Sequence, residues 1–202
     1  MLLDATVARS IAVLGWAAEL AKTVGGSLYI APGVLSTDPD ERSELRGIRD
    51  ALQREAQHAQ PGSGRQSKAV SAVDRLDMFF ALGPPTVTVL MPDPEELAMA
   101  IRLSSRDAEQ RNWRAQLGLT ARRLDAGEAV SIAIAAARNF DFASDDQQAL
   151  IAYTALGHRA GVRTRDAIKL VVARGLVEEA TARNGYRFLQ DDDLHLLGGP
   201  DW

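Results

Sequence analysis

Short apolar segments that alternate with helical segments are the feature that most constrains how this chain can fold. Strands are predicted at residues 1–4, 27–30, 86–91 and 139–143, with a short continuation at 162–163. Strands that alternate with helices in this way form a parallel sheet covered by helices on both faces. We therefore expect an α/β fold, and ligand sites on such sheets lie at the carboxyl ends of the strands.

Helical spacing of apolar residues fills most of the chain between these strands. Thr6 is in a position to cap the first helix, and residues 60–67 are predicted to form a polar loop. The predicted helices cover residues 6–14, 16–23, 39–58, 69–82, 94–103, 107–117, 125–138, 145–156 and 164–173, with a further one through residues 178–179.

Composition excludes several classes of protein. The 202 residues, 46% of them hydrophobic, are enough for one domain with a substantial core, so a single domain over residues 1–202 is expected. The absence of cysteine excludes disulfides and thiolate zinc sites and suits a reducing compartment, which makes the cytoplasm the expected location. No apolar stretch has the length needed to cross a bilayer, and we expect no membrane association.

Carboxylates recur at strand ends and helix starts. Asp4 closes the first strand, Glu128 lies in the first turn of an alanine-rich helix, and Asp145 and Asp146 directly follow the strand at 139–143. Mg²⁺ and Mn²⁺ prefer carboxylate oxygens, and two-metal hydrolysis of phosphodiesters uses several carboxylates that converge on one point. A simpler interpretation is that Glu128 and Asp145 only stabilise helix N-termini.

Three motifs together resemble the PIN-domain nucleases. They are Leu3-Asp4-Ala-Thr6-Val7, a Gly-Glu-Ala helix at residues 126–135, and a hydrophobic strand ending in Ser144-Asp145-Asp146. The resemblance covers residues 1–36 and 118–175. It implies a three-layer α/β/α sandwich with a mainly parallel sheet.

The same resemblance implies an activity, a cofactor and partners. The activity is that of a Mg²⁺- or Mn²⁺-dependent endoribonuclease, in bacteria most often the toxin of a VapBC-type toxin–antitoxin pair. The implied metal ligands are Asp4, Glu128, Asp145 and Asp146, with Thr6 and Ser144 as additional site residues. An RNA substrate, a cognate antitoxin protein and a homodimer are the implied partners.

The sequence also departs from the pattern of this family. Its members carry an acid in a Val-x-x-Glu pattern after the second strand, whereas this chain has Val34-Leu-Ser-Thr37. Asp38 takes over, or Glu41 or Glu44 reaches in, or the acid is missing and Glu128 carries its share. A fourth acid sometimes follows the last strand in the family, and Asp166 is the candidate for it. Residues 38–117 are interpreted as a mostly helical insertion and residues 176–202 as a C-terminal extension.

Basic residues are concentrated in one stretch, between Arg102 and Asp125. Six arginines stand there against three acids, and Trp113 lies among them. Arg114, Arg122 and Arg123 are candidates to hold RNA phosphates while Trp113 stacks on a base. The alternative is a solvated helix face with its own ion pairs.

Other chemistry is not indicated. The three histidines match no metal-ligand spacing, and neither a Walker loop nor a Gly-x-Ser-x-Gly elbow occurs. Residues 167–176 and 186–189 could form a helix and wing that bind DNA, but the acidic run at 191–193 would repel phosphate, so we interpret them as packing and dimerisation structure. The expected function is therefore RNA hydrolysis at a carboxylate-bound metal centre, and the alternative is a catalytically silent PIN-like binding or scaffold protein.

Overall fold

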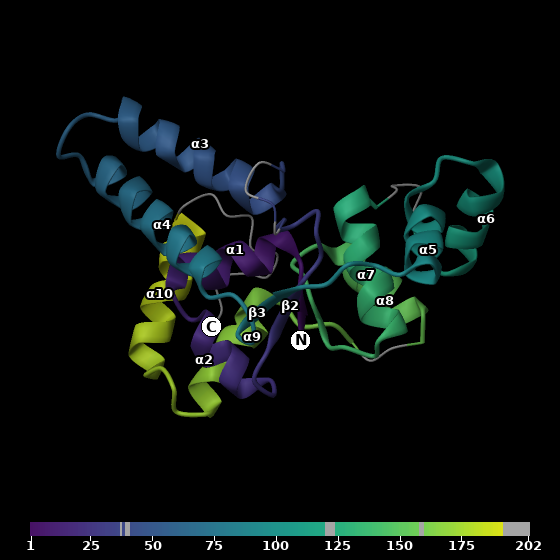
Figure 1. The fold of residues 1–202 in the computed structure, drawn as a ribbon. Helices are drawn as coiled ribbons and strands as arrows, with labels where there is room; N and C mark the ends of the chain where they lie inside the picture. The colour runs from purple at the N-terminus through teal and green to yellow at the C-terminus, as the bar shows by residue number, and fades with distance from the viewer. Residues whose placement is uncertain (37, 39–40, 120–123, 158–159, 192–202) are drawn as a thin grey trace.

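The centre of the protein is a four-stranded sheet in which all strands are parallel (Figure 1). The computed structural model describes residues 1–36, 38, 41–119, 124–157 and 160–191. The strand order is β3-β2-β1-β4, where β1 is Leu2–Leu3, β2 is Leu28–Ile30, β3 is Val87–Val89 and β4 is Phe142–Ala143. Ala143 also forms an isolated parallel bridge with Val162. The predicted parallel α/β architecture is thus confirmed, with strands shorter than expected.

Helices connect and cover the strands. In chain order they are α1 (Ala5–Leu14), α2 (Ala17–Thr23), α3 (Glu44–His58), α4 (Gly64–Ala81), α5 (Pro94–Ser104), α6 (Ala108–Gln116), α7 (Ala126–Ala137), α8 (Gln147–Ala155), α9 (Thr164–Ala173) and α10 (Glu179–Asp191). None of the helices in the described ranges has the length and apolar character of a membrane span.

Two expectations about these elements were wrong. The N-cap of α1 is Asp4, so Thr6 lies inside the first turn. Ser63 accepts a hydrogen bond from the Gln66 N–H and starts α4 at Gly64, inside the predicted loop. The rejected alternative of a β wing at residues 186–189 is also excluded, because these residues belong to α10.

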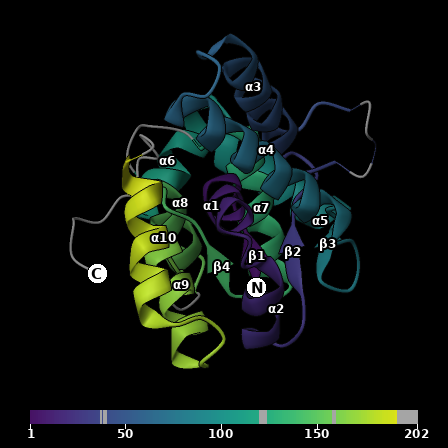
Figure 2. The same ribbon diagram turned by 90° about the vertical axis from the view of Figure 1, so that its left-hand side faces the viewer.

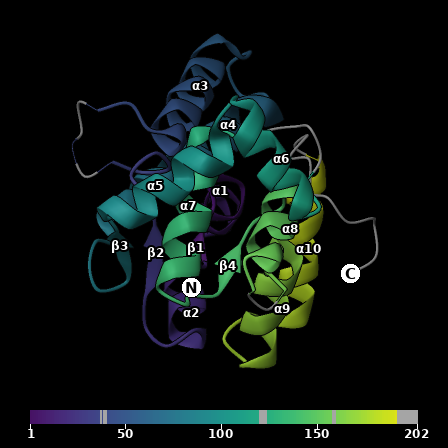
Figure 3. The same ribbon diagram turned by 90° about the vertical axis from the view of Figure 1, so that its right-hand side faces the viewer.

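The sheet separates two hydrophobic cores, because successive side chains of a strand point to opposite faces. Leu3 packs with α1, α2, α4, α9 and α10, whereas Leu2 packs with α5, α7 and α8 on the other face. Both leucines are fully buried. Figures 2 and 3 show the molecule from these two sides, with α1, α4 and α10 prominent in one view and α5, α7 and α8 in the other. Helices therefore cover both faces, an arrangement compatible with a three-layer α/β/α fold.

The strand order determines where a ligand site is expected. The chain runs outward from β1 through β2 to β3 and then crosses back to place β4 on the far side of β1. The helices that follow β1 and β4 pack on opposite faces, since α1 belongs to the core around Leu3 and α8 to the core around Leu2. The carboxyl ends of β1 and β4 thus form the switch point at which open α/β sheets bind ligands.

The segment predicted as an insertion contributes to the sheet. Residues 38–117 contain β3, which pairs with β2 along its whole length. They also contain α3 and α4, which pack side by side and extend away from the sheet (Figure 1). Arg49 on α3 donates to both carboxylate oxygens of Asp77 on α4, at 3.0 and 3.1 Å.

Candidate metal centre

Asp4 lies at the carboxyl end of β1 and is 5% exposed. Its Oδ2 accepts hydrogen bonds from the Ser144 hydroxyl at 2.5 Å and from the Thr6 hydroxyl at 3.2 Å. Burial raises the pKa of Asp4, and these two hydroxyls counteract the rise only in part. Thr6 and Ser144 therefore lie where the sequence predicted them, and both orient the carboxylate of Asp4.

Asp146 is connected to Asp4 through the same serine. The Asp146 N–H donates to Ser144 Oγ at 3.1 Å, next to the bond from Ser144 to Asp4. Asp146 caps α8, and its Oδ1 accepts from the N–H groups of Gln148 and Ala149 at 2.6 and 3.0 Å. No hydrogen bond to Asp146 Oδ2 is found within the described ranges.

Glu128 forms a capping box with Asp125 at the start of α7. The Glu128 N–H donates to Asp125 Oδ1 at 2.8 Å, and the Asp125 N–H donates to Glu128 Oε2 at 3.1 Å. Glu128 therefore does stabilise the start of α7, as the simpler interpretation proposed. Yet desolvation, followed by the charges of Asp125, Asp146 and Asp4, raises the pKa of Glu128 to about 7. Glu128 is thus both a cap and a member of an acidic group.

Glu44 is the acid that comes to this group from the region after β2. A Cβ added to Gly127 would lie 2.6 Å from Glu44 Oε1 and 3.4 Å from Asp125 Oδ1, so both carboxylates reach the first turn of α7. Desolvation and the charges of Asp125 and Asp4 raise the pKa of Glu44 to about 7. The sequence left three acids open here, and the structure brings in the last of them.

The other two candidates after β2 lie elsewhere. Asp38 is exposed and its N–H donates to Ser36 Oγ at 3.1 Å, while the Glu41 carboxylate accepts from the Ser36 hydroxyl at 2.5 Å. Neither Asp38 nor Glu41 is among the charges that raise the pKa of Asp4, Glu44 or Glu128.

Asp145 has a different role from Asp146. It is 3% exposed, and its two oxygens accept from the N–H and the hydroxyl of Thr164 at 2.9 and 2.6 Å. This pair of bonds ties the end of β4 to the start of α9. Asp166 belongs to the capping box of α9, where its carboxylate accepts from the Arg163 N–H and lies 3.9 Å from Arg165. It is also close enough to Asp145 for its charge to raise the pKa of Asp145. The structure therefore does not bring Asp145 and Asp166 together with the acids around Asp4.

Asp125 is the member of the group that sequence reasoning missed as a site residue. Its signal was present, since Asp125-Ala-Gly-Glu128 ahead of an apolar run is the pattern of a capping box. We call Asp4, Glu44, Asp125, Glu128 and Asp146 the acidic group. Its members lie at the carboxyl end of β1, after β2, after β4 and at the start of α7.

The acidic group has no basic partner in the described residues. No lysine or arginine there forms an ion pair with any of its members, and none contributes to the pKa values of Asp4, Glu44 or Glu128. Like charges this close raise each other's pKa values unless a cation offsets them. Hard divalent cations prefer such oxygen donors, so the chemistry of the group fits Mg²⁺ or Mn²⁺. Within the same residues, however, no three acid, histidine or cysteine side chains already stand in ligand geometry.

Of the three arginines predicted to contact RNA, the structure describes only Arg114, and it forms no ion pair with the acidic group. Arg114 is 3% exposed and donates to the Arg102 carbonyl at 3.0 Å, so it stabilises the turn between α5 and α6. The guanidinium of Arg102 lies 4.1 Å from the centre of the Trp113 ring, which covers one face of that ring. Arg122 and Arg123 lie outside the described residues.

Comparisons with protein-family models, with curated proteins and with solved structures found no match. Any assignment of function therefore depends on the chemistry of the acidic group.

Proposed function

We propose that this protein is a divalent-metal-dependent endoribonuclease of PIN-like fold. The observation that carries the proposal is the acidic group. In it, carboxylates from four parts of the chain come together at the sheet's switch point, and no basic residue of the described ranges pairs with them. Asp4 is buried, Glu128 and Asp146 are half-buried, and Glu44 and Asp125 are exposed at the rim of the group. Like charges held this close together repel one another, and a divalent cation would offset that cost.

Asp4, Glu44, Glu128 and Asp146 would hold the ion. When bound, Mg²⁺ or Mn²⁺ supplies a Lewis acid that makes water nucleophilic at neutral pH and stabilises charge on a phosphodiester. Thr6 and Ser144 hold Asp4 Oδ2, and Asp125 holds the backbone and one oxygen of Glu128. Asp145 positions the turn that carries Asp146, through its bonds to Thr164.

The proposal includes the partners that the resemblance implies. They are an RNA substrate, a cognate antitoxin of a VapBC-type pair and a second copy of the chain, in the cytoplasm. An antitoxin-like gene directly upstream of the coding frame would support the toxin assignment.

Calorimetric titration of Mn²⁺, run beside an RNA cleavage assay with and without EDTA, tests the proposal. We expect Mn²⁺ binding and EDTA-sensitive cleavage for the wild type, and the loss of both in Asp4→Asn. Asp166→Asn is the matched control, because it removes an acid outside the acidic group. Full activity in Asp4→Asn would show that the assignment is wrong.

A catalytically silent PIN-like binding or scaffold protein is the second candidate. One observation favours it: Glu128 Oε2 is occupied by its capping bond, and no three ligand side chains in the described residues stand in metal geometry. In the sequence, this candidate was supported by the missing family acid after β2. That support is weaker now, because Glu44 brings an acid from this region to the start of α7. A wild type that binds no Mn²⁺ would favour this candidate.

A further inference from the structure

A groove runs along one face of α3, the helix whose first turn carries Glu44 of the acidic group. Its volume is about 460 Å³. We call it the α3 groove, and its lining residues are Glu41, Arg42, Ser43, Arg46, Gly47, Asp50 and Arg54. A Cβ at Gly47 would meet no atom within 4 Å, so the floor of the groove is open at this position.

Two arginines of the groove are available to a ligand. Arg42 and Arg54 are exposed, and neither forms an ion pair with an acid in the described part of the chain. An arginine side chain without a carboxylate partner retains all its donors for a planar oxyanion such as phosphate.

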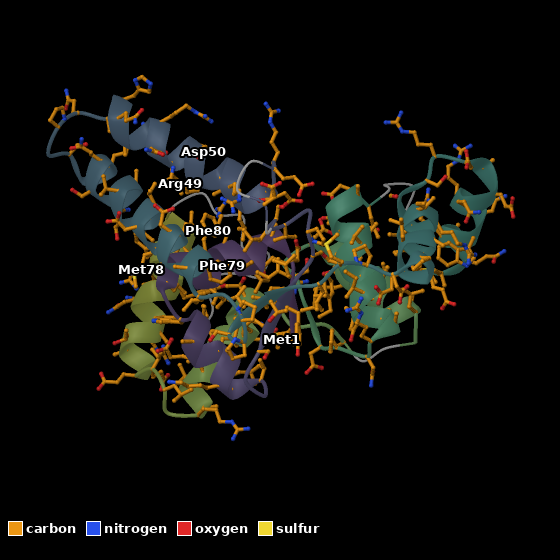
Figure 4. The ribbon with its side chains drawn as sticks, in the orientation of Figure 1. Met1, Arg49, Asp50, Met78, Phe79 and Phe80 are labelled. Atoms are coloured by element: carbon orange, nitrogen blue, oxygen red, sulfur yellow. The ribbon has the colours of Figure 1, made fainter. Side chains whose placement is uncertain are left out.

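Arg46 is held between them by the protein. Its guanidinium lies 5.5 Å from the centre of the Phe80 ring, and its Nη2 donates to the Ser36 carbonyl at 3.4 Å. Its Nε is buried and finds no hydrogen-bond partner among the described residues. Figure 4 shows Phe80 on α4 close to α3, where Arg49 and Asp50 also lie.

The carboxylates of the groove offset this positive charge only in part. Asp50 is 3.4 Å from Arg49, a fourth guanidinium next to the groove, and Glu41 accepts from the Ser36 hydroxyl. The lining therefore carries three guanidiniums against two carboxylates, in a protein whose net charge is -4. A polyanion approaching such a protein needs a local basic surface.

The position of the groove relates it to the acidic group. Glu44, a member of that group, lies in the first turn of α3 between Arg42 and Arg46. The backbone rise from Arg46 to Arg54 is about 12 Å, and Arg42 precedes the start of α3. Arg42 and Arg54 are therefore far enough apart to contact separate phosphates of one strand.

We propose that the α3 groove binds the phosphates of a single-stranded nucleic acid, next to the phosphodiester held at the acidic group. Arg42 and Arg54 donate to phosphate oxygens, and Arg46 is fixed against Phe80 between them. This inference rests on the proposed nuclease function, and it assigns the phosphate contacts to α3 in place of the arginines between residues 102 and 123.

Binding of fluorescently labelled oligouridylate and of oligothymidylate in EDTA tests the inference, since without a metal no cleavage occurs. The test variant is Arg42→Gln/Arg54→Gln, which removes two exposed arginines and leaves Arg46 in its packed position. The matched control is Arg174→Gln/Arg183→Gln, which changes net charge equally at the end of α9 and on α10, away from the groove. Circular dichroism verifies that both variants fold.

We expect the test variant to bind about tenfold more weakly. The slope of log affinity against log salt should also become shallower, by about 0.7 for each lost phosphate contact. Equal weakening in the control, or unchanged affinity in the test variant, would overturn the inference. Stronger binding of oligouridylate than of oligothymidylate identifies RNA as the source of the phosphates, and the reverse identifies DNA.

The two proposals fail separately. If the wild type neither binds Mn²⁺ nor cleaves RNA, the nuclease function is disproved, but the oligonucleotide affinities measured in EDTA still test the groove. Metal-dependent cleavage with an unaltered affinity in the test variant would remove only the role of the groove.

Discussion

At the scale of single residues, Gly127 controls whether Glu44 can join the acidic group. A side chain at this position would occupy the space of Glu44 Oε1, 2.6 Å from the added Cβ. The backbone of Gly127 needs no left-handed conformation, so the constraint is one of space. We expect Gly127→Ala to displace Glu44 and to weaken Mn²⁺ binding about tenfold, as the loss of support in a metal site does.

Calorimetry and thermal unfolding of the same variant separate this effect from misfolding. The fold should be preserved, because Glu44 is a flexible side chain that can move. Gly47→Ala, also in a helix but with open space around it, should leave Mn²⁺ affinity unchanged. An unaltered affinity in Gly127→Ala would mean that Glu44 is not a ligand.

The second prediction at this scale concerns the pH dependence of stability. Glu96 on α5 has a side chain that is 1% exposed, and its two oxygens accept from Arg138, after the end of α7, at 2.6 and 2.7 Å. This guanidinium holds the pKa of Glu96 below its ordinary value of 4.5. The folded state thus binds its proton less readily than the unfolded state, so the pair stabilises the fold above about pH 4.5 and loses its contribution as the pH falls through the lowered pKa.

Glu96→Gln should therefore lower the free energy of unfolding at pH 7 by about 2 kcal/mol. The difference from the wild type should shrink as the pH falls below about 4.5 and through the lowered pKa of Glu96, where its carboxylate becomes protonated. Urea titrations at several pH values measure both effects. A difference that is the same at every pH would contradict the assigned role of the pair.

Individual acids were predictable only where local sequence determines their position. Asp4 and Glu128 could be recognised because a strand end and a helix start are local signals. Glu44 could not be chosen over Asp38 or Glu41, since its approach to the acidic group depends on space beside Gly127, more than 80 residues further along the chain. Asp145 and Asp146 are adjacent in the sequence, and only the tertiary contact with Thr164 separates their roles.

At the scale of elements, the packing of α10 depends on a glycine. A Cβ at Gly185 would lie 2.7 Å from Trp16 Cη2 and 2.9 Å from Leu14 Cδ2, so α10 approaches the junction of α1 and α2 closely. Alanine would gain about 1 kcal/mol in helix propensity but would overpack this contact by about 1 to 3 kcal/mol. We expect Gly185→Ala to destabilise the protein.

Gly47→Ala provides the comparison for this prediction. The same substitution in α3 meets no neighbour, so it should stabilise the protein by about 1 kcal/mol. Urea denaturation of the two variants gives the two signs. Stabilisation by Gly185→Ala would mean that α10 is not tightly packed against Trp16.

Element types were predicted better than element boundaries. The strands are shorter than the β-branched or apolar runs that predicted them. At residues 86–91, for example, only Val87–Val89 pairs with β2. The start of α4 was missed because a glycine-containing polar run resembles a loop, whereas the Ser63 cap is sufficient to begin a helix there. In both cases a tertiary or capping contact moved the boundary.

At the scale of the whole molecule, the two cores are joined through the shortest elements of the fold. Adjacent residues of β1, Leu2 and Leu3, belong to opposite cores, as do Phe142 and Ala143 of β4. If one core unfolds, the sheet residues of the other core lose their support and become exposed, because a parallel sheet of this kind is buried on both faces. The alternation of apolar segments predicted this layering, but which helix covers which face was set by the crossing from β3 to β4.

We therefore expect the two sides to unfold in a single cooperative transition. Trp16 packs against the core around Leu3 and Trp113 against the core around Leu2, so each reports on one side. In chains that lack Trp202, Trp16→Phe and Trp113→Phe leave one probe apiece, and their fluorescence transitions in urea should coincide with each other and with circular dichroism. Transitions that differ in midpoint would show that the side with α5 to α8 unfolds independently, and would replace the expected single domain by two cooperative units.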